Sequence, residues 1–209
     1  AGSASNISGA SECTLCEAGT SQNQQGQLLC NDCAVGTFQN QEGQASCKLC
    51  AIGSASNETK ATECTLCELG KFQDQEGQLT CNECAPGKFQ DTQGQASCKE
   101  CSIGTASNVA GAQTCTECDP GTYQDFPAAL NCKTCDAGSF SQFSGANKCT
   151  LCPTESYQDL AGQAFCLSCP DGTTQPATGQ PLCLGTGQCD VLYGLFRSGY
   201  ESGNEPVVD

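Results

Sequence analysis

The spacing of the cysteines constrains the fold of this chain more than any other feature. Cys-x-x-Cys pairs begin at Cys13 and at every seventeenth residue after it: Cys30, Cys47, Cys64, Cys81, Cys98, Cys115, Cys132, Cys149 and Cys166. Cys183 keeps the spacing once more, and Cys189 breaks it. An uninterrupted period of this kind predicts a repeat protein in which each repeat contacts its neighbour in the same way. We therefore expect tandem repeats over residues 1–182, the first one incomplete, and a C-terminal cap or tail over 183–209.

The composition predicts a fold held together by covalent bonds. The chain has 22 Cys among 209 residues, with only four Tyr, eight Phe and no Trp, so it cannot build one large apolar core. It has no His, the commonest general base and metal ligand. The net charge of -15 argues against nucleic acid or an anionic membrane surface as partner. No apolar run approaches the roughly 18 residues that cross a bilayer, so we expect no membrane insertion.

Two glycines recur in each repeat and predict two tight turns. The first glycine stands three residues after the second Cys of a pair, with Glu155 as the exception. The second glycine stands ten residues after that Cys, with Lys60 and Ala128 as exceptions. Glycine at such positions indicates a positive φ or a close approach of two backbones. The segments between the turns are too short for an ordinary helix, so the repeats should lean towards β structure.

Side chains between the two glycines follow the same register. An aromatic residue often stands five positions after the second Cys, as Phe38 and Phe72 do, and Gln usually follows it, as in Gln39 and Gln73. We expect the aromatic residues to pack over the disulfides and the glutamines to bond from repeat to repeat. A surface that binds aromatic or sugar ligands is the alternative.

The sequence also has a longer period of 51 residues, which equals three repeats. The segments GSASN (2–6), GSASN (53–57) and GTASN (104–108) are separated by this distance. Two of them begin N-glycosylation sequons, Asn6-Ile7-Ser8 and Asn57-Glu58-Thr59, whereas Asn108 is followed by Val and Ala. We predict N-linked glycans on Asn6 and Asn57, both on exposed turns.

The cysteine pairs allow three kinds of chemistry. Their spacing is close to that of zinc ribbons, but zinc sites would group four thiolates and then insert a linker, giving a paired rhythm. Redox chemistry needs a Cys-x-x-Cys at a helix start after a strand, for which a 17-residue repeat has no room. Disulfides remain, and a local option joins the second Cys of one pair to the first of the next. These pairs are Cys16–Cys30, Cys33–Cys47, Cys50–Cys64, Cys67–Cys81, Cys84–Cys98, Cys101–Cys115, Cys118–Cys132, Cys135–Cys149, Cys152–Cys166 and Cys169–Cys183.

The pattern C-x2-G-[TK]-[FY]-Q-x4-G-x3-C-x2-C, as in Cys33 to Cys50 and Cys84 to Cys101, resembles known modules. It is similar to the cysteine-rich modules of tumour necrosis factor receptors and, more closely, to ephrin-receptor-like, EGF-like repeats. Long uninterrupted runs of repeats also resemble, loosely, cysteine-rich coat and flagellar-hair (mastigoneme) proteins of algae and protists. In the receptor modules the counterparts of Cys33 and Cys47 are paired, which supports the local option. The resemblance implies the fold class and leaves the function open.

Local pairing leaves Cys13 and Cys189 unmatched. Cys13 should bond to a Cys preceding Ala1 or to another chain, for which Cys189 is the natural partner. Alternatively, Cys189 closes on a Cys outside this segment, or on Cys183 with Cys169 paired elsewhere.

We therefore predict small disulfide-rich, β-leaning repeats that form an elongated rod or solenoid of ten 17-residue units with a disulfide ladder. The protein should be extracellular, glycosylated and not an enzyme, with no cofactor and no metal. Its acids, such as Asp74, Glu76, Asp91, Asp125 and Asp159, stand singly and lack the dense spacing of a calcium site. The leading function is structural: a building block of a filament, stalk or surface coat that self-assembles. The alternative is a receptor or adhesin ectodomain that binds a protein ligand.

Overall fold

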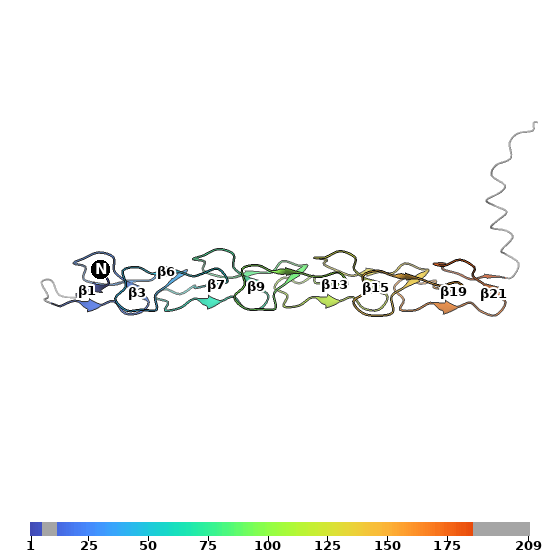
Figure 1. Cartoon of the computed structure of the whole chain (residues 1–209), viewed down its shortest axis with the longest axis horizontal. Coiled ribbons are helices and arrows are strands. Elements are labelled where there is room, and N and C mark those ends of the chain that lie inside the picture. Colours follow the sequence, from blue (N-terminus) through green and yellow to red (C-terminus); the bar gives the residue numbers. More distant parts are fainter. Residues whose placement is uncertain (6–11, 186–209) are drawn as a thin grey trace, which may run out of the picture. The chain divides into compact units, whose positions relative to one another are not determined.

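The computed structural model describes residues 1–5 and 12–185, and within these residues all regular structure consists of two-residue β-strands (Figure 1). The strands are β1 (Ser3–Ala4), β2 (Thr14–Leu15), β3 (Thr20–Ser21), β4 (Asn31–Asp32), β5 (Thr37–Phe38), β6 (Lys48–Leu49), β7 (Ser54–Ala55), β8 (Thr65–Leu66), β9 (Lys71–Phe72), β10 (Asn82–Glu83), β11 (Lys88–Phe89), β12 (Lys99–Glu100), β13 (Thr105–Ala106), β14 (Thr116–Glu117), β15 (Thr122–Tyr123), β16 (Lys133–Thr134), β17 (Ser139–Phe140), β18 (Thr150–Leu151), β19 (Ser156–Tyr157), β20 (Leu167–Ser168), β21 (Thr173–Thr174) and β22 (Leu184–Gly185).

Each strand that follows a first glycine forms a small antiparallel hairpin with the two residues inside the next Cys-x-x-Cys. In one example β5 pairs with β6, with Thr37 opposite Leu49 and Phe38 opposite Lys48. Threonine and aromatic residues favour this extended conformation, and the glycine turns limit its length. The prediction of small, disulfide-rich, β-leaning tandem repeats is therefore confirmed.

We call the segment from the second Cys of one pair to the first Cys of the next a loop. Within each compact unit described below, the same four backbone hydrogen bonds join consecutive loops. Between loops 33–47 and 50–64 they run from Gly36 N–H to Ser56 O (2.7 Å), from Gln39 N–H to Ala61 O (3.0 Å), from Lys60 N–H to Cys33 O (2.8 Å) and from Cys50 N–H to Gly36 O (3.0 Å). Because only backbone atoms take part, the stacking tolerates changes of the outward-facing side chains.

The two glycine positions confirm the prediction of positive φ. Gly36 has φ of 77° and Gly77 has φ of 71°. The three non-glycine residues with positive φ in the described part of the chain are Lys60, Ala128 and Glu155, which are the three exceptions of the sequence pattern. The first glycine also approaches the loop two further along, since a Cβ on Gly36 would lie 2.8 Å from the carbonyl carbon of Gly77 and closer still to its oxygen.

The buried interior consists of cysteines and glutamines rather than of apolar side chains. The second Cys of each pair from Cys16 to Cys152 is at most 1% exposed. Gln39 is 1% exposed; its side-chain amide donates to Ser46 O (2.7 Å), and its amide oxygen accepts the N–H of Gln41 (3.1 Å). Both partners belong to the same loop, so the expectation that glutamine side chains bond from repeat to repeat is wrong. The side chain braces its own loop, and the backbone links the loops.

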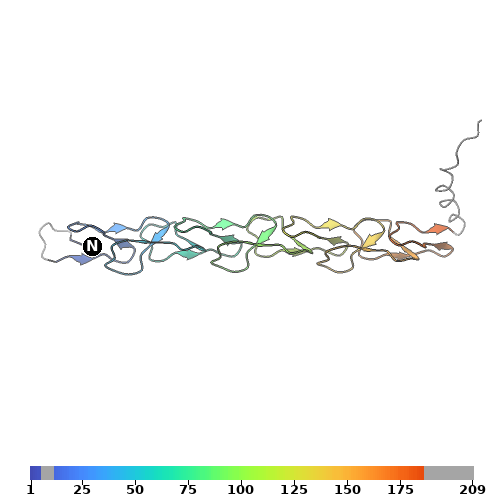
Figure 2. The same ribbon diagram turned by 45° about the horizontal axis from the view of Figure 1, so that its top comes forward.

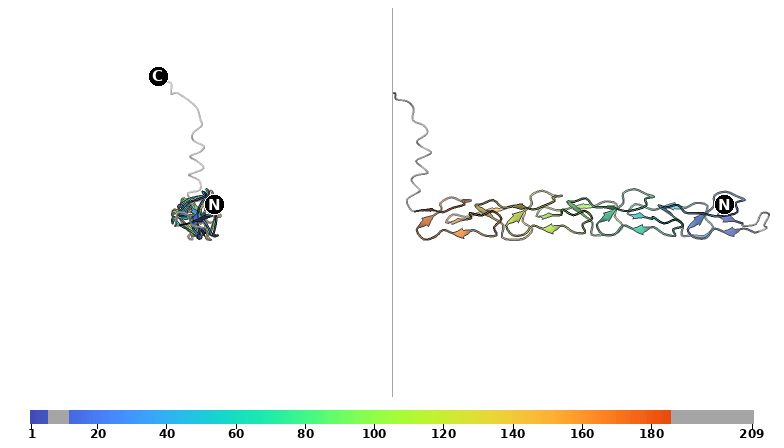
Figure 3. Two further views of the ribbon diagram at one scale, coloured as in Figure 1. Left: turned by 90° about the vertical axis from the view of Figure 1, so that its left-hand side faces the viewer. Right: turned by 180° about the vertical axis from the view of Figure 1, so that it is seen from behind.

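The chain divides into two compact units. The N-terminal unit comprises Ala1–Thr116 and Phe126–Asn131, and the C-terminal unit comprises Glu117–Asp125 and Cys132–Asp209. Within the N-terminal unit β1, β7 and β13 lie in one row along the same edge, as the rotated views also show (Figures 1, 2 and 3). Their starting residues are 51 positions apart, so every third loop of this unit faces the same side.

Candidate functional site

All twenty cysteines assigned to local pairs are disulfide-bonded in the structure, each to the partner that the local option gives it. The Cα–Cα distances of 5.6 to 5.7 Å lie in the usual range for disulfides. Each bond closes a loop with a sequence separation of 14 residues. These cysteines serve as staples, and their sulfurs are not thiolates available to a metal or to redox exchange.

Of the two unmatched cysteines, Cys13 and Cys189, the structure describes only Cys13. Cys13 is a free thiol and is exposed. Cys189 lies outside the described residues, as does most of the cap or tail expected over 183–209. Of that segment, Cys183 bonds to Cys169, and β22 pairs with β21 as in the preceding repeats.

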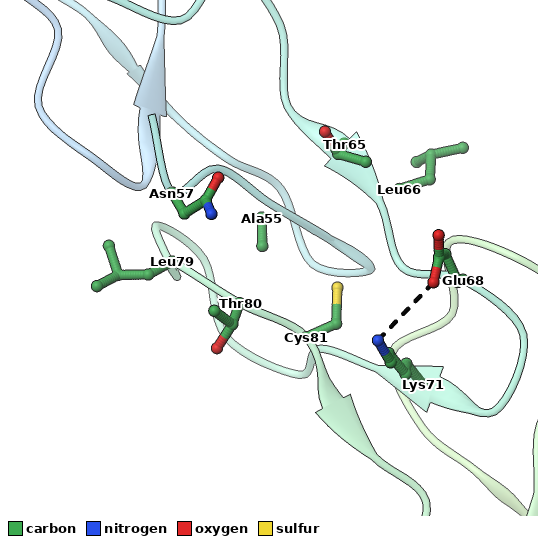
Figure 4. A pocket seen from close by; sticks show the side chains of 9 residues that line it. All are labelled: Ala55, Asn57, Thr65, Leu66, Glu68, Lys71, Leu79, Thr80 and Cys81. Atoms are coloured by element: carbon green, nitrogen blue, oxygen red, sulfur yellow. Dashed lines mark ion pairs between the residues drawn. The ribbon is translucent and has the colours of Figure 1, made fainter. Parts of the chain in front are cut away.

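The surface of the N-terminal unit has a recess of about 310 Å³, which we call the Ala55 recess (Figure 4). Ala55, on β7, occupies the register position that holds a half-buried aromatic ring in loops such as 33–47. Its side chain is buried, with 6% exposure, but a methyl group fills far less space than a ring. The lining residues are Ala55, Asn57, Thr65, Leu66, Glu68, Lys71, Leu79, Thr80 and Cys81.

An equivalent recess of about 330 Å³ lies 51 residues earlier, beneath Ala4. Ala4, Thr14, Leu15, Glu17 and Leu28 take the places of Ala55, Thr65, Leu66, Glu68 and Leu79. At two of the three segments that mark the period, 2–6 and 53–57, an alanine thus stands beside a recess where other loops carry an aromatic ring. The sequence analysis did not predict these recesses.

Two predicted glycosylation sites fall beside these recesses in the sequence. Asn57 is exposed, lies in a turn region with Glu58 and Thr59, and contributes to the wall of the Ala55 recess. In Figure 4 its amide points towards the space above Ala55, with Leu79 and Thr80 on one side and Thr65 and Leu66 on the other. Asn6 follows Ala4 by two residues and lies outside the described part of the structure. Glycosylation of both residues stays a prediction.

Charged pairs cap some of the aromatic rings. Lys99 forms an ion pair with Asp91 and lies 5.8 Å from the centre of the Phe89 ring. The hydrogen bond from Lys99, with a smaller one from Thr92, holds the pKa of Asp91 below its ordinary value of 3.8. Sequence reasoning treated Asp91 as a single acid. The signal that it missed is the spacing of eight residues from Asp91 to Lys99, which directly follows Cys98, the first Cys of its pair.

The C-terminal unit repeats this arrangement. Lys133 forms an ion pair with Asp125 and lies 5.7 Å from the centre of the Tyr123 ring. The bond to Lys133 lowers the pKa of Asp125, and the same bond raises the pKa of Lys133. Both aspartates thus serve as partners of a lysine.

Neither a metal cluster nor a membrane span is found in residues 1–5 and 12–185. No three His, Cys, Asp or Glu side chains in these ranges are grouped closely enough to hold a metal ion. Nor do these ranges include a helix with the length and apolar character that crossing a membrane requires.

A comparison with protein families identifies a family for most of the chain. The family model described as tyrosine-protein kinase ephrin type A/B receptor-like matches residues 27–63, 53–88, 104–147 and 138–181. A search of curated proteins finds no sequence that matches the chain. The four matched ranges overlap in two pairs and together cover more than half of the 209 residues, which confirms the resemblance to ephrin-receptor-like repeats.

Proposed function

The chain belongs to the tyrosine-protein kinase ephrin type A/B receptor-like family, and from this premise we propose that it is a structural protein of the extracellular space. Repeats of this kind are structural or binding domains rather than catalytic ones. We propose more specifically that the protein is a building block of a filament, stalk or surface coat, assembled through contacts between copies.

The observation that supports a structural role is the uniform junction between loops. Gly36 N–H bonds to Ser56 O, and 34 residues further on Gly70 N–H bonds to Gln90 O in the same manner. Cysteine recurs in every repeat, and glycine and glutamine recur in most of them; these residues close the loops and stack them on one another. Side chains at one outward register position vary instead, as Gln41, Glu58 and Thr92 do.

The disulfides support an extracellular location. Ten of them persist only where the surroundings are oxidising, as outside cells or in the secretory pathway. The loops they close would each be worth about 3 kcal/mol in the chain-entropy model. A reducing compartment would remove the main source of stability of a chain without an apolar core.

Assembly into filaments is supported by the repeat geometry and by exposed apolar side chains. Leu49 and Leu151 stand directly before the second Cys of their pairs and are 56% and 59% exposed. Similar surfaces repeated along a molecule favour contacts related by translation, which generate open fibres rather than closed rings.

Electron microscopy of the purified full-length chain over a range of concentrations tests this proposal. We expect filaments whose subunits share one helical symmetry. A field of dispersed particles at every concentration would contradict the filament and favour the alternative, a receptor or adhesin ectodomain with a separate protein ligand.

A covalent link between copies is a second element of the proposal. The exposed thiol of Cys13 would bond to Cys189 of another copy, giving a head-to-tail polymer. Gel electrophoresis without reductant should then show a ladder that collapses to a monomer band with reductant, and Cys13→Ser should abolish the ladder. A monomer band without reductant removes the covalent link but leaves non-covalent assembly to the microscopy.

A further inference from the structure

We propose that Asn57 carries an N-linked glycan whose first N-acetylglucosamine occupies the Ala55 recess. The inference concerns the surface of the chain within a secretory pathway and does not depend on assembly into filaments.

The first step is access to the attachment site. Asn57, Glu58 and Thr59 are all exposed, and Asn57 lies outside a strand, directly before a bend at Glu58 and a turn at Thr59. In this loop Ser56 replaces the buried glutamine, and its hydroxyl bonds only to Glu58 O, 3.4 Å away. In loop 33–47 the Gln39 side chain donates to Ser46 O, seven residues along the loop, and Ser56 makes no such bond within loop 50–64. A sequon on an exposed, less braced turn can reach the transferase that attaches the glycan.

The second step is the chemistry of the recess. Leu66 and Leu79 are 56% and 48% exposed and form its apolar walls, suited to the acetyl methyl group and one face of a sugar ring. Thr65, Thr80 and the Glu68–Lys71 ion pair supply polar groups for the sugar hydroxyls (Figure 4). The volume of about 310 Å³ lies at the small end of ligand pockets, which fits one monosaccharide better than an extended chain.

The third step is the choice of occupant. The acceptor Asn57 is itself part of the wall, so an attached sugar is held beside the recess at a high effective concentration. Moreover, both sequons of the chain stand two residues after an alanine at the ring position, Ala4 and Ala55, and no loop with a ring has a sequon. The third such alanine, Ala106, is followed by Asn108 outside a sequon. A free aromatic or sugar ligand would not require this coincidence. The glycan thus takes the place of the missing aromatic ring.

The experiment uses the full chain secreted from eukaryotic cells. Peptide mapping by mass spectrometry should find a glycan on Asn57, and an unmodified Asn57 would overturn the proposal. The glycan is then trimmed to a single N-acetylglucosamine, and this protein is compared with the unglycosylated Asn57→Asp variant. We expect hydrogen exchange at residues 65–66 and 79–80 to be about fivefold slower with the sugar, equivalent to about 1 kcal/mol.

A direct contact is measured by NMR on the trimmed protein. Nuclear Overhauser effects should join the acetyl methyl group to the methyl groups of Leu66 and Leu79. Ala55→Phe, which fills the recess, should abolish these effects while the glycan stays attached, and Leu79→Ser should weaken the remaining effect to Leu66. A modified Asn57 with unchanged exchange and no such effects would overturn the seating of the sugar. Filaments seen or not seen by microscopy would not alter either outcome.

Discussion

Replacing Gly36 by alanine tests whether the tight stacking of loops requires glycine at its first position. The φ of 77° costs a residue with a Cβ about 1–2 kcal/mol. The new Cβ would also lie 2.8 Å from the carbonyl carbon of Gly77, where real Cβ atoms essentially never come under 3.0 Å. Because the obstacle is backbone, no side-chain rotation relieves it, and the two loops must move apart.

Moving Gly36 away from Gly77 displaces the Gly36 backbone, and this also weakens the hydrogen bonds that Gly36 makes to loop 50–64, which stands between the two loops in sequence. These are the bond from its N–H to Ser56 O at 2.7 Å and the bond from Cys50 N–H to its own carbonyl at 3.0 Å. At about 1 kcal/mol for each bond, with the cost of φ added, we expect a loss of about 3 kcal/mol in local stability.

Hydrogen exchange followed by mass spectrometry measures this loss without requiring the repeats to unfold as one unit. Exchange in residues 48–60 of Gly36→Ala should be roughly a hundredfold faster than in the unchanged chain. Gly26→Ala is the matched control, because Gly26 has φ of 75° but no atom within 4 Å of an added Cβ. It should lose only about 1 kcal/mol, from φ alone. Equal effects of the two substitutions would refute the argument from close approach.

Two further predictions concern side chains. Gln39→Leu leaves Ser46 O and the N–H of Gln41 without their partner, so this loop should lose about 2 kcal/mol of local stability by hydrogen exchange, whereas Gln41→Leu at an exposed position should change little. Lys99→Ala should raise the pKa of Asp91 towards 3.8, measured by NMR titration of its carboxyl. Since the pKa of Asp91 is lower in the folded chain, the pair stabilises the fold above about pH 4, and this contribution is lost as the pH falls through the lowered pKa. An Asp91 titration unchanged by Lys99→Ala would show that the pair does not form in solution.

The repeat could be predicted in detail wherever a position has one backbone role. Glycine at positions 36 and 77 predicted a positive φ, because few other residues adopt it, and both residues have a positive φ in the structure. The exceptions were informative as well, since Lys60, Ala128 and Glu155 adopt the same backbone in spite of its cost. Local conformation dominates at these positions, and sequence alone reports local conformation well.

The role of glutamine was harder to predict because its amide can bond in several directions. The regular spacing of the glutamines favours hydrogen bonds between the side chains of neighbouring repeats. Gln39 instead bonds to the backbone of Ser46 and Gln41 in its own loop. The turn at the second glycine brings these backbone groups within reach, and sequence alone does not supply that geometry. The recess at Ala55 was missed for a related reason. A recess is formed by several loops together, and here Leu66 and Leu79 come from the repeats that follow Ala55. Their placement around Ala55 cannot be read from the sequence of one repeat.

The fixed loop length has a consequence for how such a chain can change in size. All ten disulfides of the described residues span 14 residues, and within each compact unit every junction uses the same backbone atoms, so one repeat of a unit can be removed or inserted without altering the bonds that close the gap. In the N-terminal unit, deleting 17 residues would carry all later side chains to a different side, whereas deleting 51 would return them to the side they left. The length of this unit can therefore change by one repeat at a time. The side on which later side chains lie is kept only when three repeats are added or removed together.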